Sequence, residues 1–402
     1  MTRDVDPLEQ LTLEGLRRRT SQKWQGHDAE LLPLWVAEMD VLLAPEVEDA
    51  LMRAIREGDT GYSANHGYAE AVAGFAADRW GWGAFPVGAT RVLADVMSAI
   101  VEVVKVSSAP GDAVVVTSPV YAPFFSYLAH ADREVVQARL TDDGRLDPQS
   151  IRDALGEQKR KGLGAVLLLS NPHNPTGTVP TRAELEGVAE VAQEFGVRVL
   201  SDEIHAPLTL PGATFTPYLT VAGSSNAVAF VSASKGWNLA GVKAALAVAG
   251  VGARADLAAV PSELDYAPSH LGVLAHTAAF RESRGWLDAL LLGLDKKRSL
   301  LDALLKEHVP GVTWHPSEGT YLAWLDCRAL EVPPVMSGSG FAVATDIAGP
   351  AKLFHDHGVA LNSGHIFGDG GDGFVRLNFA TTTEVLTEAV TRMGRAVGDA
   401  TH

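Results

Sequence analysis

The middle of the chain alternates continuous apolar runs with helix-like segments, and this alternation constrains the fold more than any other feature. The runs are DAVVVTS, AVLLLS, VRVLSD and NAVAFVS, and none of them alternates in polarity. Strands of this kind are buried on both faces, as in parallel sheets covered by helices. We therefore predict an α/β fold whose large domain has a mostly parallel sheet sandwiched by helices.

Two of the intervening segments carry clear helix signals. In PEVEDALMRAIREG, Pro45 stands at a favoured first helical position and Gly58 at a favoured stop. In TRAELEGVAEVAQEFG, Thr181 and Glu184 form a capping box, which satisfies backbone N–H groups at a helix start. We expect helices over both segments.

The last third of the chain has a different pattern. WLDALLLGLDKKRSLLDALLKEH has helical spacing, and the strand-like segments GTYLAWLDC and FVRLNFA follow it. This pattern predicts a smaller α+β domain built from both chain ends. We expect the large domain over residues 46–284 and the small domain over residues 1–45 and 285–402. The stretch from Pro333 to Gly340 has the composition of a loop insertion.

Charge and composition exclude several classes of protein. The net charge of −16 argues against nucleic acid and anionic membranes as partners. No apolar run approaches the roughly 18 residues of a membrane span, and the opening MTRDVDPLEQ lacks the apolar core of a signal peptide. These features predict a cytoplasmic protein.

We expect neither a disulfide nor a metal site. The single cysteine, Cys327, excludes an internal disulfide and is interpreted as a small core residue. The HDH triplet at His355 has no third ligand at helical spacing. The GDGGDG stretch from Gly368 lacks the ligand spacing of a calcium loop, and we expect a turn there.

Polar residues follow the apolar runs at four places, in SPVY, SNPHNPTG, SDEIH and SASK. In open parallel sheets, ligands bind beyond the carboxyl ends of the strands. The four polar segments therefore predict one shared site.

Lys235, in SASK, is the most unusual of these residues. An ammonium at the end of a buried run is costly unless it is paired or neutral. A neutral, desolvated lysine is a nucleophile that bonds covalently to carbonyl carbon. The alternative is an ordinary exposed lysine on a loop, and Lys235 taken alone does not decide between the two.

The other polar residues also have two interpretations each. Asp202 is a cap or ion-pair partner, or it holds a proton on the ring nitrogen of a cofactor. Asn174 lies in a rigid Pro-Gly turn that is either a plain connection or part of the site, and Tyr121 is a core aromatic or a stacking surface. Arg376 lies in a strand-like run, where a partly buried guanidinium commonly pairs with a carboxylate of the protein or of a ligand.

Taken together, these segments resemble a known superfamily. SNPHNPTG, SDEIH, SASKGWNLAG and FVRLNFA, in this order, are similar to the motifs of fold-type I pyridoxal-phosphate enzymes, the aspartate aminotransferase superfamily. LPLWVAEMDVLLAPEV, GYSANHGY, SPVYAPF and GTYLAWLDCR resemble the narrower branch of carbon–sulfur β-lyases of the MalY/PatB cystathionine β-lyase type.

The resemblance implies roles around the cofactor ring. Lys235 would attach pyridoxal 5′-phosphate covalently and act as the catalytic base. Asp202 would keep the ring nitrogen protonated, Asn174 would donate to the ring oxygen, and Tyr121 would stack on the ring. His205 stands where many aminotransferases have a tyrosine near the ring oxygen, which favours the lyase branch.

The resemblance also implies how the phosphate and the substrate are held. The phosphate would contact Ser232, Ser234, Lys243 and the backbone at Val96 and Met97. Tyr62 would reach the phosphate of the neighbouring subunit, which implies a homodimer with active sites at the subunit interface. Arg376, with Asn174 and Tyr121, would bind the α-carboxylate of an amino-acid substrate.

This chain departs from the family pattern at two places. Asp95, in ADVM, stands where the family usually has a glycine beside the phosphate, and AEMD replaces the more usual Ala-Asp-Met-Asp.

The implied function is β-elimination from L-cystathionine or another cysteine S-conjugate, giving a thiol, pyruvate and ammonia. Homocysteine is the thiol from cystathionine, which would place the enzyme in methionine biosynthesis. An aminotransferase remains an alternative, and so does a pyridoxal-phosphate-binding regulator with little catalysis. The sequence leaves the choice among cysteine conjugates open.

Overall fold

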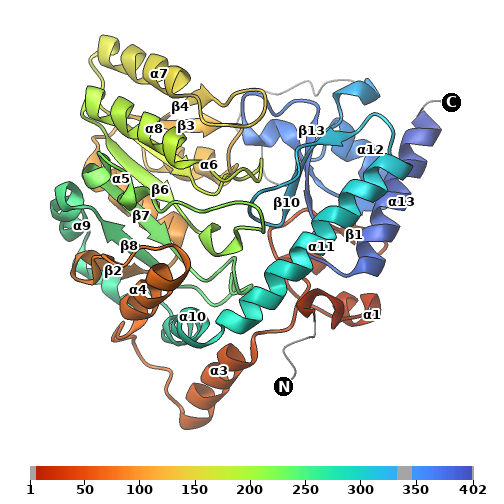
Figure 1. The fold of residues 1–402 in the computed structure, drawn as a ribbon, viewed down its shortest axis with the longest axis horizontal. Coiled ribbons are helices and arrows are strands. Elements are labelled where there is room, and N and C mark those ends of the chain that lie inside the picture. The colour runs from red at the N-terminus through yellow and green to blue at the C-terminus, as the bar shows by residue number, and fades with distance from the viewer. Residues whose placement is uncertain (1–5, 333–345, 401–402) are drawn as a thin grey trace.

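The computed structural model describes residues 6–332 and 346–400, so the predicted loop at Pro333–Gly340 lies outside the described residues. A seven-stranded sheet has the order β2-β8-β7-β6-β5-β3-β4 (Figure 1). Its strands are β2 (Thr90–Leu93), β3 (Ala113–Ser118), β4 (Glu134–Arg139), β5 (Ala165–Ser170), β6 (Arg198–Asp202), β7 (Ala227–Val231) and β8 (Ala245–Ala249). Neighbours from β4 to β7 pair in parallel, whereas β8 is antiparallel to both β7 and β2. The prediction of a mostly parallel sheet is confirmed.

Helices cover both faces of this sheet. The helices of this part are α3 (Pro45–Glu57), α4 (Tyr68–Arg79), α5 (Val96–Ser107), α6 (Pro123–His130), α7 (Pro148–Lys161), α8 (Arg182–Phe195), α9 (Arg254–Ala259) and α10 (His270–Glu282). On β3, Val114 and Val116 belong to an apolar cluster with α5 and α6, while Val115 belongs to a second cluster with α7 and α8. This alternation follows from the two-residue period of a strand and explains why every residue of β3 is apolar or buried.

Both predicted helices form where their end signals stand. Helix α3 begins at Pro45, and Gly58 caps its end at φ 71°, a left-handed conformation that glycine adopts without strain. Helix α8 has the predicted capping box of Thr181 and Glu184.

A second sheet of four strands, in the order β12-β13-β10-β9, is antiparallel. The strands of this sheet are β9 (Thr313–Trp314), β10 (Leu322–Asp326), β12 (Asn362–Ser363) and β13 (Phe374–Asn378). The helices of this part of the chain are α11 (Arg284–His308), α12 (Pro350–Asp356) and α13 (Thr383–Ala400). Figure 1 shows α11 running diagonally past this sheet, from its start beside α10 towards α13. Among the described residues, no helix combines the length and the apolar character needed to cross a bilayer.

The N-terminal segment joins this C-terminal part. It holds α1 (Leu13–Arg17), α2 (Gln22–Gln25) and β1 (Leu32–Pro33), and β1 pairs in parallel with β11 (Val359–Ala360). This pairing agrees with a smaller unit made from both chain ends. The domain boundaries at residues 46 and 284 stay a prediction.

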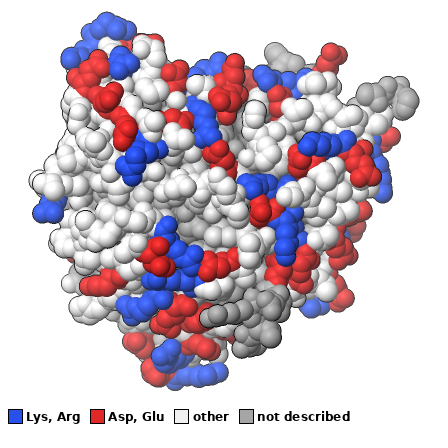
Figure 2. Space-filling view, viewed as in Figure 1, with Lys and Arg blue, Asp and Glu red and all other residues white. Residues whose placement is uncertain are grey.

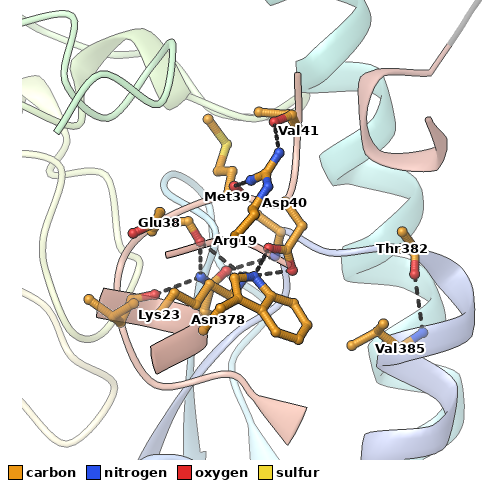
Figure 3. A network of polar contacts seen from close by, with 12 residues as sticks. Arg19, Lys23, Glu38, Met39, Asp40, Val41, Asn378, Thr382 and Val385 are labelled. Atoms are coloured by element: carbon orange, nitrogen blue, oxygen red, sulfur yellow. Dashed lines mark hydrogen bonds and ion pairs between the residues drawn. The ribbon is translucent and has the colours of Figure 1, made fainter. Parts of the chain in front are cut away.

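A polar network fixes the segment that follows β1 (Figure 3). Lys23 Nζ lies 2.7 Å from Asp40 Oδ2, with both side chains fully buried, and Trp24 Nε1 donates to Asp40 Oδ1 at 2.8 Å. Asn378, at the end of β13, donates to the carbonyls of Val36 at 2.7 Å and Glu38 at 2.6 Å. The backbone between residues 36 and 40 is therefore held from two sides.

We expect Lys23→Met to lower the free energy of unfolding by about 3 kcal/mol, because it leaves the Asp40 carboxylate buried without its cation. Equilibrium urea denaturation measures this loss. The matched control is Arg18→Met, which removes an ion pair with Glu14 whose side chains are 72% and 89% exposed. That change should stay within about 0.5 kcal/mol, and equal losses in the two variants would contradict the prediction.

Candidate functional site

A cavity of about 190 Å³ opens beyond the carboxyl ends of β5, β6 and β7. It is lined by Asp95, Val96, Met97, Tyr121, Tyr127, Ser170, Asn174, Asp202, Ile204, His205, Ser234, Lys235, Ala240 and Lys243. All four polar segments that follow the apolar runs contribute to this lining. The four polar segments therefore converge at one edge of the sheet, as predicted.

Lys235 follows β7, and its half-buried side chain lines the cavity. Its Nζ donates a hydrogen bond to the carbonyl of Ala37 at 2.8 Å. Desolvation lowers the pKa of Lys235 to about 8, and the positive charge of Arg376 acts in the same direction. With that pKa, about a tenth of the molecules carry a neutral amine at pH 7, whereas an unperturbed lysine is almost entirely charged.

Asp202 ends β6, and its buried carboxylate lines the same cavity. Burial raises the pKa of Asp202 to about 7, against the lowering effect of a hydrogen bond from the Ile204 N–H. A carboxyl with this pKa readily exchanges a proton near neutral pH.

The neighbouring Glu203 has a different environment. Its carboxylate accepts from Ser201 Oγ at 3.0 Å and from the Tyr218 N–H at 2.8 Å, and it does not line the cavity. Burial raises the pKa of Glu203 to about 8. Glu203 is thus a mostly protonated core residue behind the site.

Arg376, on β13, does not itself line the cavity, but it contacts Asn174, which does. Its Nη1 donates to Asn174 Oδ1 at 3.0 Å, and its Nη2 donates to Asn362 Oδ1 at 2.7 Å and to the Trp35 carbonyl at 3.0 Å. Its guanidinium lies 4.9 Å from the centre of the Phe367 ring. Burial lowers the pKa of Arg376 to about 10.

No carboxylate of the described residues pairs with Arg376. The buried Nε of Arg376 has no hydrogen-bond partner among the described residues either. A buried guanidinium that only neutral oxygens contact is suited to an anionic ligand group.

Tyr121 and His205 also line the cavity. The Tyr121 ring meets Phe124 edge-on at 5.5 Å, and burial raises the pKa of its hydroxyl to about 12. His205 is 2% exposed, and its Nδ1 has no hydrogen-bond partner among the described residues. Desolvation lowers the pKa of His205 well below its usual value, so the ring is neutral. A buried ring nitrogen without a partner, at the wall of a cavity, indicates a polar ligand.

Five of the lining residues belong to the segments that the resemblance assigns to the phosphate, and we call this set the phosphate end: Asp95, Val96, Met97, Ser234 and Lys243. Val96 and Met97 begin α5, and the first N–H groups of a helix have no partner within the helix. Lys243 Nζ lies 2.8 Å from Asp95 Oδ2.

Two of the predicted phosphate contacts lie elsewhere. Ser232 is buried and does not line the cavity, because its hydroxyl donates to the Ala244 carbonyl at 2.8 Å and lies 2.9 Å from Ser234 Oγ. Tyr62 is 83% exposed, packs edge-on against Tyr266 at 5.9 Å and does not line the cavity of its own chain.

The sequence interpretation missed some contributors. Tyr127, on α6, lines the cavity beside Tyr121, and the carbonyl of Ala37 accepts hydrogen bonds from both Lys235 and the Tyr321 hydroxyl, each at 2.8 Å. A backbone carbonyl leaves no signal in residue identity. The only available hint was that Ala37 lies in the WVAEMD segment.

The remaining candidates lie outside the cavity. Cys327 is 1% exposed and burial raises its pKa, which confirms a small core residue. Gly368 precedes turns that lead into β13, as expected. Within the described ranges, His, Cys, Asp and Glu form no group of three with metal-binding geometry.

On the face shown in Figure 2, basic side chains lie interspersed with acidic ones.

Comparison with known proteins places the chain in a family. Residues 31–393 match the family model for aminotransferase class I and II. A Mycobacterium tuberculosis protein named "Putative cystathionine beta-lyase" is 56% identical over 400 residues, covering 98% of each chain. The cystathionine beta-lyase of Corynebacterium glutamicum is 31% identical over 95% of this chain and 98% of its own.

A solved structure agrees over the same length. The crystal structure of cystalysin from Treponema denticola, which contains a pyridoxal 5′-phosphate cofactor, superposes with a TM-score of 0.84 at 26% identity. It covers 98% of this chain and 99% of its own. On the family match and the full-length relatives, the chain belongs to the class I and II aminotransferase family.

Proposed function

We propose that the protein is a pyridoxal-phosphate-dependent carbon–sulfur β-lyase that cleaves L-cystathionine or a related cysteine S-conjugate. One water is consumed, the products are a thiol, pyruvate and ammonia, and the thiol from cystathionine is homocysteine. One observation carries the proposal: Lys235, with a pKa near 8, lines the same cavity as the buried carboxylate of Asp202. The two full-length relatives that are named as cystathionine β-lyases support it.

The donors at the cavity fit the functional groups of pyridoxal phosphate. A partly neutral Lys235 amine suits an aldehyde, and Asp202 suits a protonated ring nitrogen. The unpartnered His205 Nδ1 and the Asn174 amide suit the polar edge of the ring, and Tyr121 suits its face. At the phosphate end, Ser234, Lys243 and the first N–H groups of α5 are suited to an anion.

Pyridoxal phosphate, when bound, supplies an electron sink conjugated to the substrate Cα. The chain supplies the proton transfers. Lys235 Nζ removes the proton from Cα as general base, and loss of that proton lets the sulfur leave from Cβ. Asp202 holds a proton at the ring nitrogen, which strengthens the electron demand at Cα.

Arg376 and Asn174 bind the substrate's α-carboxylate in this proposal. Arg376 already contacts Asn174, and no carboxylate of the described residues competes for the guanidinium. The fork of a guanidinium matches a carboxylate in two parallel hydrogen bonds.

We expect Arg376→Ala to raise KM for amino-acid substrates about 100-fold while kcat changes less, because charge-assisted hydrogen bonds of this kind contribute about 1.5–3 kcal/mol each and act in ground and transition states alike. Steady-state pyruvate release over a substrate titration measures both constants. Arg328→Ala is the control, since Arg328 pairs with Asp326 outside the cavity. An unchanged KM in Arg376→Ala would remove Arg376 from substrate binding.

The capture of pyridoxal phosphate by the apoprotein should become faster as pH rises from 6 to 9. Only the neutral amine attacks an aldehyde, and the neutral fraction of Lys235 grows through its pKa of about 8. Stopped-flow absorbance at several pH values gives the midpoint, expected near 8. A midpoint above pH 10 would mean that Lys235 is not desolvated in solution.

The reaction itself is tested by supplying L-cystathionine and measuring pyruvate with a coupled dehydrogenase. Release of pyruvate together with a free thiol is the expected result. Transfer of the amino group to a 2-oxo acid without release of pyruvate would identify an aminotransferase instead. Cofactor binding without either reaction would favour the regulatory alternative.

We further propose a homodimer in which Tyr62 of one copy reaches the phosphate end of the other. Tyr62 is 83% exposed and packs against Tyr266, which is 66% exposed, so this aromatic pair is available to a second copy. Light scattering of the purified protein tests the dimer. The cytoplasmic location stays a prediction.

A further inference from the structure

The phosphate end contains the carboxylate of Asp95, and the phosphate group of the proposed cofactor would be a second anion at the same place. Asp95 lines the cavity next to the first residues of α5 and next to Lys243. This inference rests on the proposed function, because it concerns the phosphate group of pyridoxal phosphate.

One carboxylate oxygen of Asp95 caps the start of α5. Its Oδ1 accepts from the Ser98 N–H at 2.8 Å, and Ser98 Oγ accepts from the Asp95 N–H at 3.2 Å in return. A carboxylate in this position satisfies a backbone donor and complements the positive end of the helix dipole. The carboxylate therefore uses a backbone donor and a positive helix end that would otherwise bind a phosphate.

The other carboxylate oxygen engages Lys243. Asp95 Oδ2 lies 2.8 Å from Lys243 Nζ, with side chains 28% and 59% exposed. Burial alone would raise the pKa of Asp95, but the hydrogen bonds from Lys243 and Ser98 outweigh it and lower the pKa, so the carboxylate is ionised at neutral pH.

The charges at the phosphate end consequently cancel. The charged side chains that line the whole cavity are Asp95, Asp202, Lys235 and Lys243. Covalent attachment uses Lys235, and Asp202 lies at the end of β6 with the ring-binding residues. Lys243 is then the cation left for the phosphate, and Asp95 already neutralises it. A phosphate ester carries a charge of about −1.5 to −2 near pH 7.

We propose that Asp95 weakens the hold of this enzyme on the cofactor phosphate, by competing with that phosphate for Lys243 and for the start of α5. Binding of the phosphate must loosen the Asp95–Lys243 pair and place two anions close together. The cofactor is thus held mainly through its ring and its bond to Lys235, and the phosphate contributes less than the donors around it would otherwise provide.

The test is Asp95→Asn, which removes the charge and keeps a side chain that caps helices as well as aspartate does. Apoprotein is titrated with pyridoxal phosphate, with pyridoxal and with inorganic phosphate, by absorbance for the first two and by calorimetry for the third. We expect Kd for pyridoxal phosphate to fall at least tenfold, about 1.4 kcal/mol. The Kd for inorganic phosphate should fall as well, and that for pyridoxal should change less than twofold.

Asp147→Asn is the matched control, because Asp147 caps α7 through the Gln149 N–H and does not line the cavity. It should alter none of the three constants. An Asp95→Asn protein with unchanged or weaker pyridoxal-phosphate binding overturns the inference, and so does an equal gain for pyridoxal, since the effect would then lie at the ring.

Failure of the proposed function gives a different result. Wild-type protein that binds no pyridoxal phosphate refutes the proposed function. The inorganic-phosphate titration then decides the inference by itself: tighter binding to the Asp95→Asn protein supports it, and equal binding overturns it.

Discussion

Replacing Lys235 by alanine is expected to lower pyruvate release from cystathionine by a factor of about 10⁴ or more. A positioned general base alone contributes about 10²–10⁴, and this lysine would also be the residue that attaches the cofactor covalently. The alanine protein should retain its fold, because the change removes a desolvated ammonium whose one hydrogen bond to the described residues goes to the Ala37 carbonyl.

A second readout separates chemistry from folding. Borohydride should fix pyridoxal phosphate permanently to Lys235 in the wild-type protein, and peptide mass spectrometry should find the label in the SASK segment. The Lys235→Ala protein should carry no label. Lys105→Ala is the control, since Lys105 pairs with Glu102 on the surface of α5 and should behave as wild type. Label at another lysine, or normal activity without Lys235, would refute the assignment.

Asp202→Asn is expected to lower kcat by about 10³ or more. Preorganised electrostatic partners of a developing charge contribute about 10²–10³ each, and this carboxylate in addition keeps the ring nitrogen protonated. Asparagine has nearly the same shape, so the cavity wall is kept. Single-turnover pyruvate release measures the chemical step, and a loss below tenfold would contradict the role.

Glu203→Gln is the matched control, one residue further along the chain. The pKa of Glu203 is about 8, so glutamine imitates the protonated form that predominates at pH 7. Its contacts with Ser201 and Tyr218 lie outside the cavity. The Glu203→Gln protein should therefore keep its activity, whereas a general sensitivity of buried carboxylates would lower the activity of both variants.

The sheet and the meeting of its polar strand ends were predictable because both follow from local patterns. A continuous apolar run is buried on both faces, and parallel strands bring their carboxyl ends to one edge. That argument correctly grouped Tyr121, Asn174, Asp202 and Lys235 around one cavity. It did not predict that β8 runs antiparallel, because a continuous apolar run such as ALAVA carries no information about the direction of its strand.

The finer placement of side chains was not predictable from residue type. Ser232 and Ser234 are two residues apart, yet only Ser234 lines the cavity, because the Ser232 hydroxyl bonds to the Ala244 carbonyl. The Asp95–Lys243 pair joins residues 148 positions apart, and no local pattern reports such a distance. The capping role of Asp95 has a local signal, namely Ser98 three residues on.

The hydrogen bond from Arg376 to the Trp35 carbonyl spans 341 positions, and it has a consequence for synthesis. A ribosome that adds about 5–20 residues per second needs roughly 17–70 s to make that length of chain. During this time β1 and the segment after it have emerged, but their partners β11 and β13 do not yet exist. The contacts of β1 with β11 and of Trp35 with Arg376 can therefore form only after every strand of the central sheet has been made. Slower translation would lengthen the exposure of that segment without changing the finished enzyme.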